Sequence, residues 1–530
     1  MSPPTTGGRT MARAGLLALC VLALGASSAW AALPTQYVGK VWSEALGRAI
    51  DYPTYSAERT YLDTNGCNLT TLRRVAKDAF TSAEYTALGY DNQTKVLTLY
   101  RALLNRDPDP AGLTAWTGSL NSGTSISTVI DNMTASAEFT TLTTSICSAT
   151  TPNYGWGTFA AVALTPTGAG FTGTGAALQT LLNGTPPGGT VALAQKSLVN
   201  LTTTLTIPAG VTLTTTGGPG PNQYGMMGRL ARNFGGTNAP TVILQGGARL
   251  RNVWVDGQKT FHRNFDLYNP NLQVQGGSGT EASSNRIDNT QGWTSIAIGG
   301  SESQVGNIGL FPCARATVSG NLVTAYGSSH DAGVTSDGIS SACENTTITN
   351  NSVIDMSDVG IIIFESDLVT QRSLVQGNTV VQYGQSAYAA YAADPLRPSE
   401  VRGTPSFVGS SVTGNTLWTT ERTHFHIGLS VGTRPWFGTT GNDGTGASFT
   451  NNSVPTGARV WAPNGIVVSG MLNVTVTGNN VDTSLVRGLD SCTVASIGVE
   501  VTGHWSGTVQ GPTTAGNFSS CIFPRDPRNP

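Results

Sequence analysis

The sequence is poor in charge: Asp, Glu, Lys and Arg make up 11% of its 530 residues, and the formal net charge is −2. Such a chain carries neither the basic surface that binds nucleic acid nor an acidic tail. Hydrophobic residues still make up 39% of the chain, which argues against disorder. Gly, Thr, Ser and Asn dominate instead, and they suit a long sheet surface with frequent turns. We therefore expect an extracellular β-solenoid.

Long apolar runs are missing, with one short exception near the N-terminus. Arg9 and Arg13 precede an apolar run over 14–24, and Ala29-Trp30-Ala31 then has the small residues of a cleavage site. The run is shorter than the ~20 residues that a membrane-spanning helix needs, which disfavours a membrane anchor. We predict a bacterial signal peptide over 1–31 and a mature, soluble protein that is secreted or held at the cell surface.

Paired cysteine motifs are absent too, because no two cysteines have the C-x-x-C spacing of a zinc or redox site. No nucleotide, haem or zinc motif is present. Cys20 leaves with the predicted signal peptide, and an even number of cysteines remains. In an oxidising compartment this predicts disulfides, although six cysteines allow 15 pairings. The six are Cys67, Cys147, Cys313, Cys343, Cys492 and Cys521.

Residues 32–148 contain an internal repeat with helical periodicity. Leu46-Gly47-Arg48 matches Leu104-Asn105-Arg106, and segment 81–85 matches segment 135–139. We predict a helical domain over 32–148 that folds on its own and is separable at the linker near Tyr154.

The second copy of the repeat reads L-x-R-D-P-D-x-x-G-x-x-x-W over 104–116. It resembles a helical family of unknown function found on many bacterial secreted and surface proteins. In the first copy Thr54 and Glu58 replace the Gly and Trp of this motif, which indicates a degenerate, structural copy. Asp107 and Asp109 suit either a calcium loop or helix capping, and Asp109 followed by Pro favours capping. The resemblance implies that this domain contacts a surface, a partner protein or the neighbouring domain.

A β-helix is predicted for most of the remaining chain. Residues 149–172 are rich in Thr, Pro and Gly and indicate a linker. A short amphipathic helix over 176–182 and turn-and-strand segments follow, in an order that resembles the opening of the pectate-lyase-like superfamily. The resemblance implies a mainly β fold, in which a right-handed parallel β-helix over 173–490 is capped by that helix and followed by a C-terminal coil and tail over 491–530.

A turn motif, [G/N/S]-N-x-[V/L/I], recurs through this region at intervals of 27 to 37 residues. A β-helix coil needs roughly 20–30 residues, and the excess forms loops. An antiparallel sandwich is the competing fold, but it does not repeat one turn residue in each coil. Stacked Asn side chains in such turns form an internal hydrogen-bonded ladder, so we assign them a structural role. They are Asn285, Asn321, Asn351, Asn378, Asn415, Asn452 and Asn479.

The ladder register also predicts a disulfide. Cys313 and Cys343 each precede a ladder Asn by eight residues. Equivalent positions on adjacent coils lie about 4.8 Å apart, which is within disulfide range. We therefore predict Cys313–Cys343, and proximity within each domain suggests Cys67–Cys147 and Cys492–Cys521.

Residue types that support catalysis concentrate at 330–367, where His330, Asp337 and Asp358 lie. Asp337 and Asp358 are 21 residues apart, about one coil, so their carboxyl groups are candidates to divide acid and base roles across a glycosidic bond. Segment 335–338 resembles the first Asp motif of polygalacturonases. The Asp-Asp, Gly-His-Gly and Arg-Ile-Lys motifs of that family are missing. Asp before Gly is also a common turn residue, so turn and capping roles compete.

The register of the Gly-containing strand motif determines how Asp337 and Asp358 align with each other. If Gly338 and Gly360 are equivalent, Asp337 aligns with Val359, whereas Asp358 aligns with His426, two residues before the Gly of its own strand motif. The two carboxyl groups are then offset by one residue.

A lyase needs a base, and lysine is nearly absent from the predicted solenoid, so that base has to be Arg, His or Tyr. Arg can clamp carboxylates, and Trp can stack on a sugar face. Loop arginines are, however, ordinarily only solvated. The candidates for substrate binding or base catalysis are Tyr388, Tyr391, Arg397, Arg402, Arg422, His424, His426, Arg434 and Trp436.

Two classes of function remain open. One is an enzyme that binds a polysaccharide and cleaves it, as an acidic-glycan lyase or a glycoside hydrolase. The other is a non-catalytic surface or matrix protein that binds glycan. The incomplete catalytic motifs favour the second, and the concentration of His, Asp and Arg favours the first. We expect no cofactor, with calcium as the one that the sequence leaves open.

Overall fold

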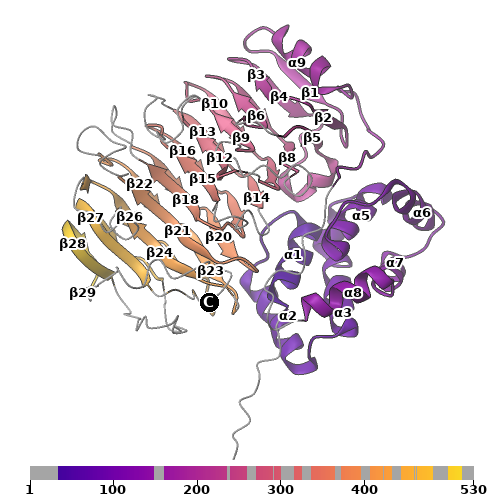
Figure 1. Ribbon diagram of the computed structural model, residues 1–530, viewed down its shortest axis with the longest axis horizontal. Helices are drawn as coiled ribbons and strands as arrows, with labels where there is room; N and C mark the ends of the chain where they lie inside the picture. The colour runs from indigo at the N-terminus through magenta and orange to yellow at the C-terminus, as the bar shows by residue number, and fades with distance from the viewer. Residues whose placement is uncertain are drawn as a thin grey trace, which may run out of the picture.

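A computed structural model describes most of the chain. The described residues are 34–147, 160–235, 239–258, 270–290, 292–299, 315–324, 336–364, 372–395, 406–421, 423–432, 443–458, 460, 462, 464–481, 499–511 and 513–515. They form a helical module, residues 34–147, and a long stack of parallel strands (Figure 1). The predicted signal peptide lies outside the described residues.

The helices of the module begin at capping side chains. Every helix from α2 to α8 starts after an Asp, Asn or Ser whose side-chain oxygen accepts a backbone N–H of the first turn, as Asp109 does from Gly112 at 2.8 Å. The elements are α1 (Thr35–Leu46), α2 (Tyr52–Asn65), α3 (Leu69–Phe80), α4 (Ala83–Ala87), α5 (Asn92–Leu99), η1 (Tyr100–Leu104), α6 (Pro110–Asn121), α7 (Ile126–Thr134) and α8 (Ala137–Ile146).

The internal repeat is present in three dimensions. Arg48 donates two hydrogen bonds to Glu84, at 2.7 and 2.8 Å, and Arg106 donates two to Glu138, at 2.7 and 2.9 Å. The predicted Cys67–Cys147 disulfide is confirmed and ties the start of α3 to the end of the module.

The β-helix has three strands in each coil, and every pairing between named strands is parallel. We call the three stacks columns A, B and C. Column A contains β1 (Thr190–Leu193), β4 (Thr212–Thr215), β7 (Arg249–Arg251), β10 (Thr280–Ser283), β13 (Ala316–Ser319), β16 (Thr347–Thr349), β19 (Leu374–Gln376), β22 (Ser411–Thr413) and β26 (Ser448–Thr450). Column B contains β3 (Leu205–Ile207), β6 (Val242–Leu244), β9 (Leu272–Val274), β12 (Thr294–Ile298), β15 (Asp337–Ser341), β18 (Val359–Phe364), β21 (Ala387–Asp394) and β24 (Phe425–Val431).

Column C is a separate sheet of eight strands: β2 (Leu198–Leu201), β5 (Gly228–Arg232), β8 (Val253–Asp256), β11 (Arg286–Asp288), β14 (Leu322–Thr324), β17 (Ser352–Ile354), β20 (Thr379–Gln382) and β23 (Thr416–Thr419). Columns A and B merge at the far end through β25 (Gly444–Thr445), β27 (Asn464–Thr477), β28 (Val499–Val509) and β29 (Thr513–Ala515). The solenoid thus continues past residue 490. The predicted parallel β-helix is confirmed.

The Asn ladder is confirmed at all seven positions, each of them buried. Within it, Asn378 donates its side-chain N–H to the side-chain oxygen of Asn415 at 2.9 Å and accepts a bond from Asn351 at 2.9 Å. The chain of bonds runs from Asn285 to Asn479 and ends on Gln510, which takes the same position in the next coil. It satisfies polar groups that the turns would otherwise bury unpaired.

A helix covers the first coil, as predicted. The helix α9 (Gly175–Asn183) buries Leu178 and Leu182 completely and packs against β2 and β3 at the end of the stack (Figure 1). Before it, Phe171 forms a bridge to Leu193, so the predicted linker partly pairs with the first coil. A short 3-10 element, η2 (Pro221–Met226), precedes β5. None of the helices in the described ranges is long and apolar enough to cross a membrane.

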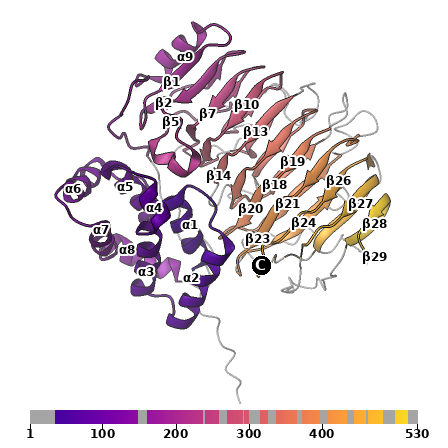
Figure 2. The ribbon, with the colours of Figure 1, turned by 180° about the vertical axis from the view of Figure 1, so that it is seen from behind.

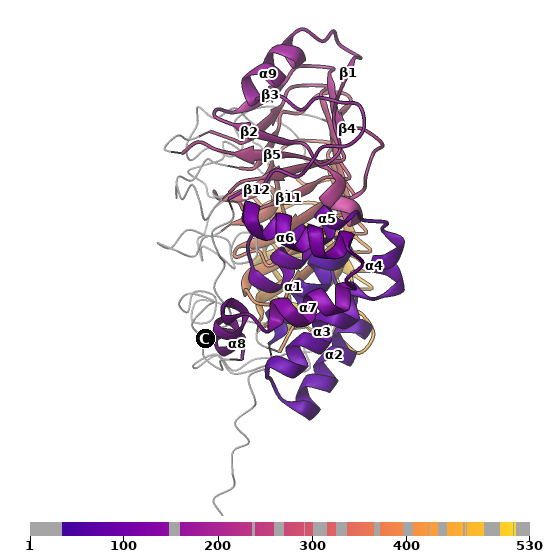
Figure 3. The ribbon, with the colours of Figure 1, turned by 90° about the vertical axis from the view of Figure 1, so that its right-hand side faces the viewer.

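The helical module lies along the outer side of column C (Figures 2 and 3). At one end Tyr90 donates its hydroxyl hydrogen to the carbonyl of Asn222 at 2.9 Å. At the other end the Ile50 amide donates to the Tyr383 hydroxyl at 2.8 Å, and Arg59 pairs with Glu421 at 2.8 Å. A Cβ on Gly39 would lie 2.3 Å from the Tyr383 ring, so only glycine allows this approach.

Candidate functional site

The predicted catalytic residues lie on column B, and their register is as the sequence predicted. Asp337 aligns with Val359, because Ile339 pairs with Ile361 in parallel register. Asp358 therefore belongs to the neighbouring row. That row runs through five consecutive coils, and its residues are Trp293, Ser336, Asp358, Tyr388 and His426. We call these five residues the column B row.

Asp337 is a buried carboxyl group on the strand that precedes Asp358. One oxygen accepts the backbone N–H of Val359 at 2.9 Å, and the other accepts the hydroxyl of Ser340 at 2.7 Å. Burial raises the pKa of Asp337 well above its usual range, and the nearby Asp358 carboxylate raises it further. Asp394, at the end of β21, adds a smaller effect of the same sign. A carboxyl group with a raised pKa can serve as a proton donor near neutral pH.

Two histidines lie at the start of β24, two strands from Asp358: His424 precedes the strand and His426 is its second residue. The His424 and His426 ring centroids are 5.1 Å apart, and the His426 ring is 5.1 Å from that of Tyr388. Nδ1 of His424 is 3.0 Å from the hydroxyl of Ser386. Burial lowers the pKa of His424 to about 4, so its imidazole is neutral at pH 7.

The floor of the site is apolar. A cluster separate from the main core covers the outer face of column B, and Trp293 and Tyr388 pack against it while staying partly exposed. This face thus offers carboxyl groups and aromatic rings over an apolar surface, a combination typical of ligand sites. The cluster contains Ala342, Val359, Ile362, Phe364, Ala389, Ala392, Ile427 and Val467.

The other predicted site residues fall in different places. Tyr391 is fully buried inside the solenoid, where its hydroxyl donates to the carbonyls of Asn378 and Thr416 at 2.9 Å, so it does not join this face. Cys343 is disulfide-bonded, and Cys313, its predicted partner, is outside the described residues. His330, Arg397, Arg402, Arg422, Arg434, Trp436, Cys492 and Cys521 also lie outside them.

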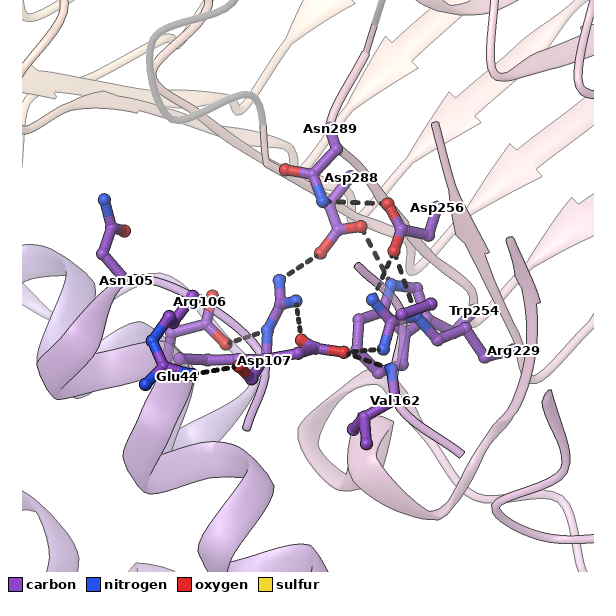
Figure 4. Close-up of polar contacts among 12 residues, drawn as sticks. Glu44, Asn105, Arg106, Asp107, Val162, Arg229, Trp254, Asp256, Asp288 and Asn289 are labelled. Carbon is purple, nitrogen blue, oxygen red and sulfur yellow. Dashed lines mark hydrogen bonds and ion pairs between the residues drawn. The ribbon is translucent and has the colours of Figure 1, made fainter. Parts of the chain in front are cut away.

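A second polar assembly joins the helical module to column C (Figure 4). The guanidinium group of Arg101 is buried and binds three carboxylates: Glu44 at 3.2 Å, Asp107 at 3.0 Å and Asp288 at 2.8 Å. Asp107 comes from the repeat motif. It also binds Arg229 of β5 and accepts the Val162 amide at 3.0 Å.

Three guanidinium groups and four carboxylates make up this assembly, and Lys40, whose pKa burial lowers well below its usual value, lies beside them. We call it the docking cluster, and its members are Lys40, Glu44, Arg101, Asp107, Arg229, Asp256, Arg286 and Asp288. Trp254 and Tyr224 stack under its guanidinium groups, with Arg229 and Arg286 each 3.9 Å from a ring centroid. Burial opposes ionisation of Asp256, yet the neighbouring Arg229 keeps its pKa below the usual value.

The docking cluster gives Asp107 and Asp109 separate roles. Asp109 caps α6, as predicted, whereas Asp107 binds the arginines of the interface. Within the described ranges, no group of three or more His, Cys, Asp or Glu side chains is arranged to hold a metal ion. Sequence reasoning missed the cluster, although one signal existed. In a solenoid with few charges, β5, β8 and β11 carry Arg229, Asp256, Arg286 and Asp288 at positions that alternate with core residues.

Comparison with known families gives one match, to a domain of unknown function, DUF4214, over residues 76–143. This is the region of the second repeat, and it lies within the helical module. No curated protein matches the chain.

Some solved structures are similar over part of the chain. The Dettilon tailspike protein is 14% identical, and the match covers 55% of this chain and 60% of the tailspike, with a TM-score of 0.31. An alginate lyase from Paenibacillus sp. is 16% identical over 58% of this chain and 97% of its own, with a TM-score of 0.31. A GH87 α-1,3-glucanase from Streptomyces thermodiastaticus is 13% identical over 66% and 68%, with a TM-score of 0.32. Because these scores are below 0.5, the fold and the site rest on the strand pairing described above.

Proposed function

We propose that this protein binds a polysaccharide on the outer face of column B and hydrolyses a glycosidic bond at Asp337 and Asp358. One geometric observation carries the proposal. The Asp337 carboxyl group is hydrogen-bonded to the amide of Val359, the residue that follows Asp358, so the two acids lie on adjacent coils of one face. Two carboxyl groups that differ in environment are the catalytic set of most glycoside hydrolases.

The two acids differ in the way that this chemistry needs. Asp337 is buried, and its raised pKa keeps its proton available for the leaving oxygen. Asp358 is more exposed, so it is the better base toward water or the better nucleophile. The hydrolysis needs no other group: a proton moves to the leaving oxygen, and water supplies the hydroxyl of the new end.

The competing role for Asp337 is purely structural, because both of its oxygens have hydrogen-bond partners. Substitution separates the two roles. Asp337→Asn and Asp358→Asn should each abolish the release of reducing ends from a panel of purified polysaccharides while the thermal midpoint stays near that of the native protein. Asp63→Asn, a surface substitution in α2, is the control. Full cleavage by both variants would contradict the proposal.

Elimination is a second candidate, and His424 supports it. Its neutral imidazole can accept a proton, and its Nε2 is buried without a hydrogen-bond partner among the described residues. In this reaction an acidic sugar loses its C5 proton, and the glycosidic bond breaks to leave a double bond. The predicted clamps, Arg422 and Arg434, would hold its carboxylate. Unsaturated products that absorb in the ultraviolet would identify elimination, and reducing ends without that absorbance would identify hydrolysis.

We also propose that the protein is exported. The n-region, apolar run and A-x-A site at 1–31 support this, and the Cys67–Cys147 disulfide is typical of proteins from oxidising compartments. N-terminal sequencing of the protein recovered outside bacterial cells should begin at Ala32. Recovery of the full-length chain from the cytoplasm alone would contradict export.

A further inference from the structure

We infer that the column B row is a linear sugar-binding track, in which Trp293 and Tyr388 are stacking platforms on either side of Asp358 for an uncharged glycan that lies along the solenoid axis. This inference rests on the proposed function and adds to it the direction, the contacts and the class of the substrate. It follows from the parallel register, which places the five residues of the row in line.

Trp293 and Tyr388 are separated along the axis of the solenoid. Neighbouring strands of a sheet lie about 4.8 Å apart, so Trp293 and Tyr388, three strands apart, are separated by about 14 Å along the stack. Asp358 stands between them, two strands from Trp293 and one from Tyr388. The two platforms are therefore unequally spaced from the acid, although the five-residue row is centred on it.

The Trp293 and Tyr388 rings are held in place by packing against column B. Both rings pack against the apolar cluster of column B, and both remain partly exposed. The Tyr388 ring also contacts the His426 ring at 5.1 Å, with 34° between the planes. An aromatic ring that is fixed on one side and open on the other loses little entropy when a flat apolar sugar face covers it.

The chemistry of the row defines the class of glycan. Its partly exposed members, Trp293, Asp358 and Tyr388, present two aromatic rings and a carboxyl group, whereas Ser336 and His426 are buried. None of the five carries a guanidinium or ammonium group. Asp337 and Asp394 add two more carboxyl groups to column B, and Asp394 is buried at the end of β21. A uronate at the centre of this track would meet the like charge of the Asp358 carboxylate, which disfavours binding. Uncharged sugars offer hydroxyl groups to the same side chains at no such cost.

The test uses the full-length protein and two sets of probes. Binding is measured by titration calorimetry with maltohexaose, cellohexaose and laminarihexaose, and separately with hexagalacturonate and an alginate hexamer. We expect at least one neutral hexasaccharide to bind, and Trp293→Ala and Tyr388→Ala each to weaken it about tenfold or more. Trp293→Phe and Tyr388→Phe keep a ring and should stay within about threefold. Ile362→Ala, in the same apolar cluster but outside the row, is the control for packing.

Cleavage assays separate the failure of this inference from that of the proposed function. Loss of a platform should raise KM with kcat largely kept, because stacking acts equally on the bound substrate and on the transition state. If Asp358→Asn abolishes cleavage while the two alanine variants bind and cleave normally, the track is wrong and the hydrolase stands. If only the uronate probes bind, or no probe binds, the assignment of an uncharged glycan is overturned.

Discussion

Replacing Arg101 with methionine should cost far more stability than the same change at Arg106. Arg101 is the centre of the docking cluster: its side chain is 2% exposed and binds Glu44, Asp107 and Asp288. Its removal leaves four buried carboxylates with the guanidinium groups of Arg229 and Arg286. Breaking a buried, hydrogen-bonded charge network by removing one partner costs about 3–5 kcal/mol. We expect a loss in that range for Arg101→Met.

The control lies five residues away on the same segment. Arg106 binds Glu138 and Asp109, but its side chain is 27% exposed and that of Glu138 is 42% exposed. Exposed ion pairs contribute about 0–1 kcal/mol, so Arg106→Met should cost no more than that.

Urea unfolding, followed by far-ultraviolet circular dichroism for the helices and by tryptophan fluorescence, measures both variants. In Arg101→Met the helical signal should be lost at a lower urea concentration. Adding Glu44→Gln removes one of the carboxylates that Arg101 had paired and should recover part of the loss. If Arg101→Met and Arg106→Met differ by less than about 1 kcal/mol in unfolding free energy, the docking cluster does not hold the helical module to column C.

Further predictions concern the ladder, a buried histidine, a disulfide and the module. Asn378→Ala removes the hydrogen bonds to Asn351 and Asn415 and leaves their buried polar groups without those partners. It should lower the unfolding free energy by about 3 kcal/mol, measured by urea unfolding. The unfolded state protonates His424 near its ordinary pKa of 6.5 and the folded state only near 4, so stability falls as pH drops through this window. Between pH 6.5 and 4, a His424→Gln variant should lose up to about 3 kcal/mol less unfolding free energy than the native protein. Parallel plots of unfolding free energy against pH for the two proteins would refute this. The Cys67→Ser/Cys147→Ser variant opens a loop of 80 residues and should lose up to about 4 kcal/mol by thermal or urea unfolding. A fragment of residues 32–148 should give a helical circular dichroism spectrum, and a disordered one would contradict its independence.

Sequence periodicity was enough for the solenoid, because each coil repeats the same buried turn. The Asn spacing located the ladder, and the Gly spacing correctly aligned Asp358 with His426. Tyr391 shows where simple alternation fails. Ala390 and Tyr391 both belong to the interior cluster, whereas Ala389 and Ala392 belong to the cluster on the outer face. Two consecutive inward residues break the period of two on which the sequence prediction depended.

The docking cluster was missed for a different reason. Its members are spread from Lys40 to Asp288, and each looks like an ordinary charged residue in its own segment. Only the fold brings them together. Trp293 was missed because it precedes its strand as a single residue outside any motif, and the register alone assigns it to the column B row.

The position of the helical module has a consequence for how the whole chain unfolds. In an isolated solenoid each coil touches only its neighbours, so a stack can fray from either end one coil at a time. Here the helical module is attached at β5, through Arg229, and near β23, through Glu421, six strand steps or about 29 Å apart. The module therefore braces the coils between these two attachments. None of these coils can open without breaking a contact between the module and the solenoid. We therefore expect the coils beyond β24 to unfold first when the chain is stretched by force. The coils between β5 and β23 should then unfold together in a single step.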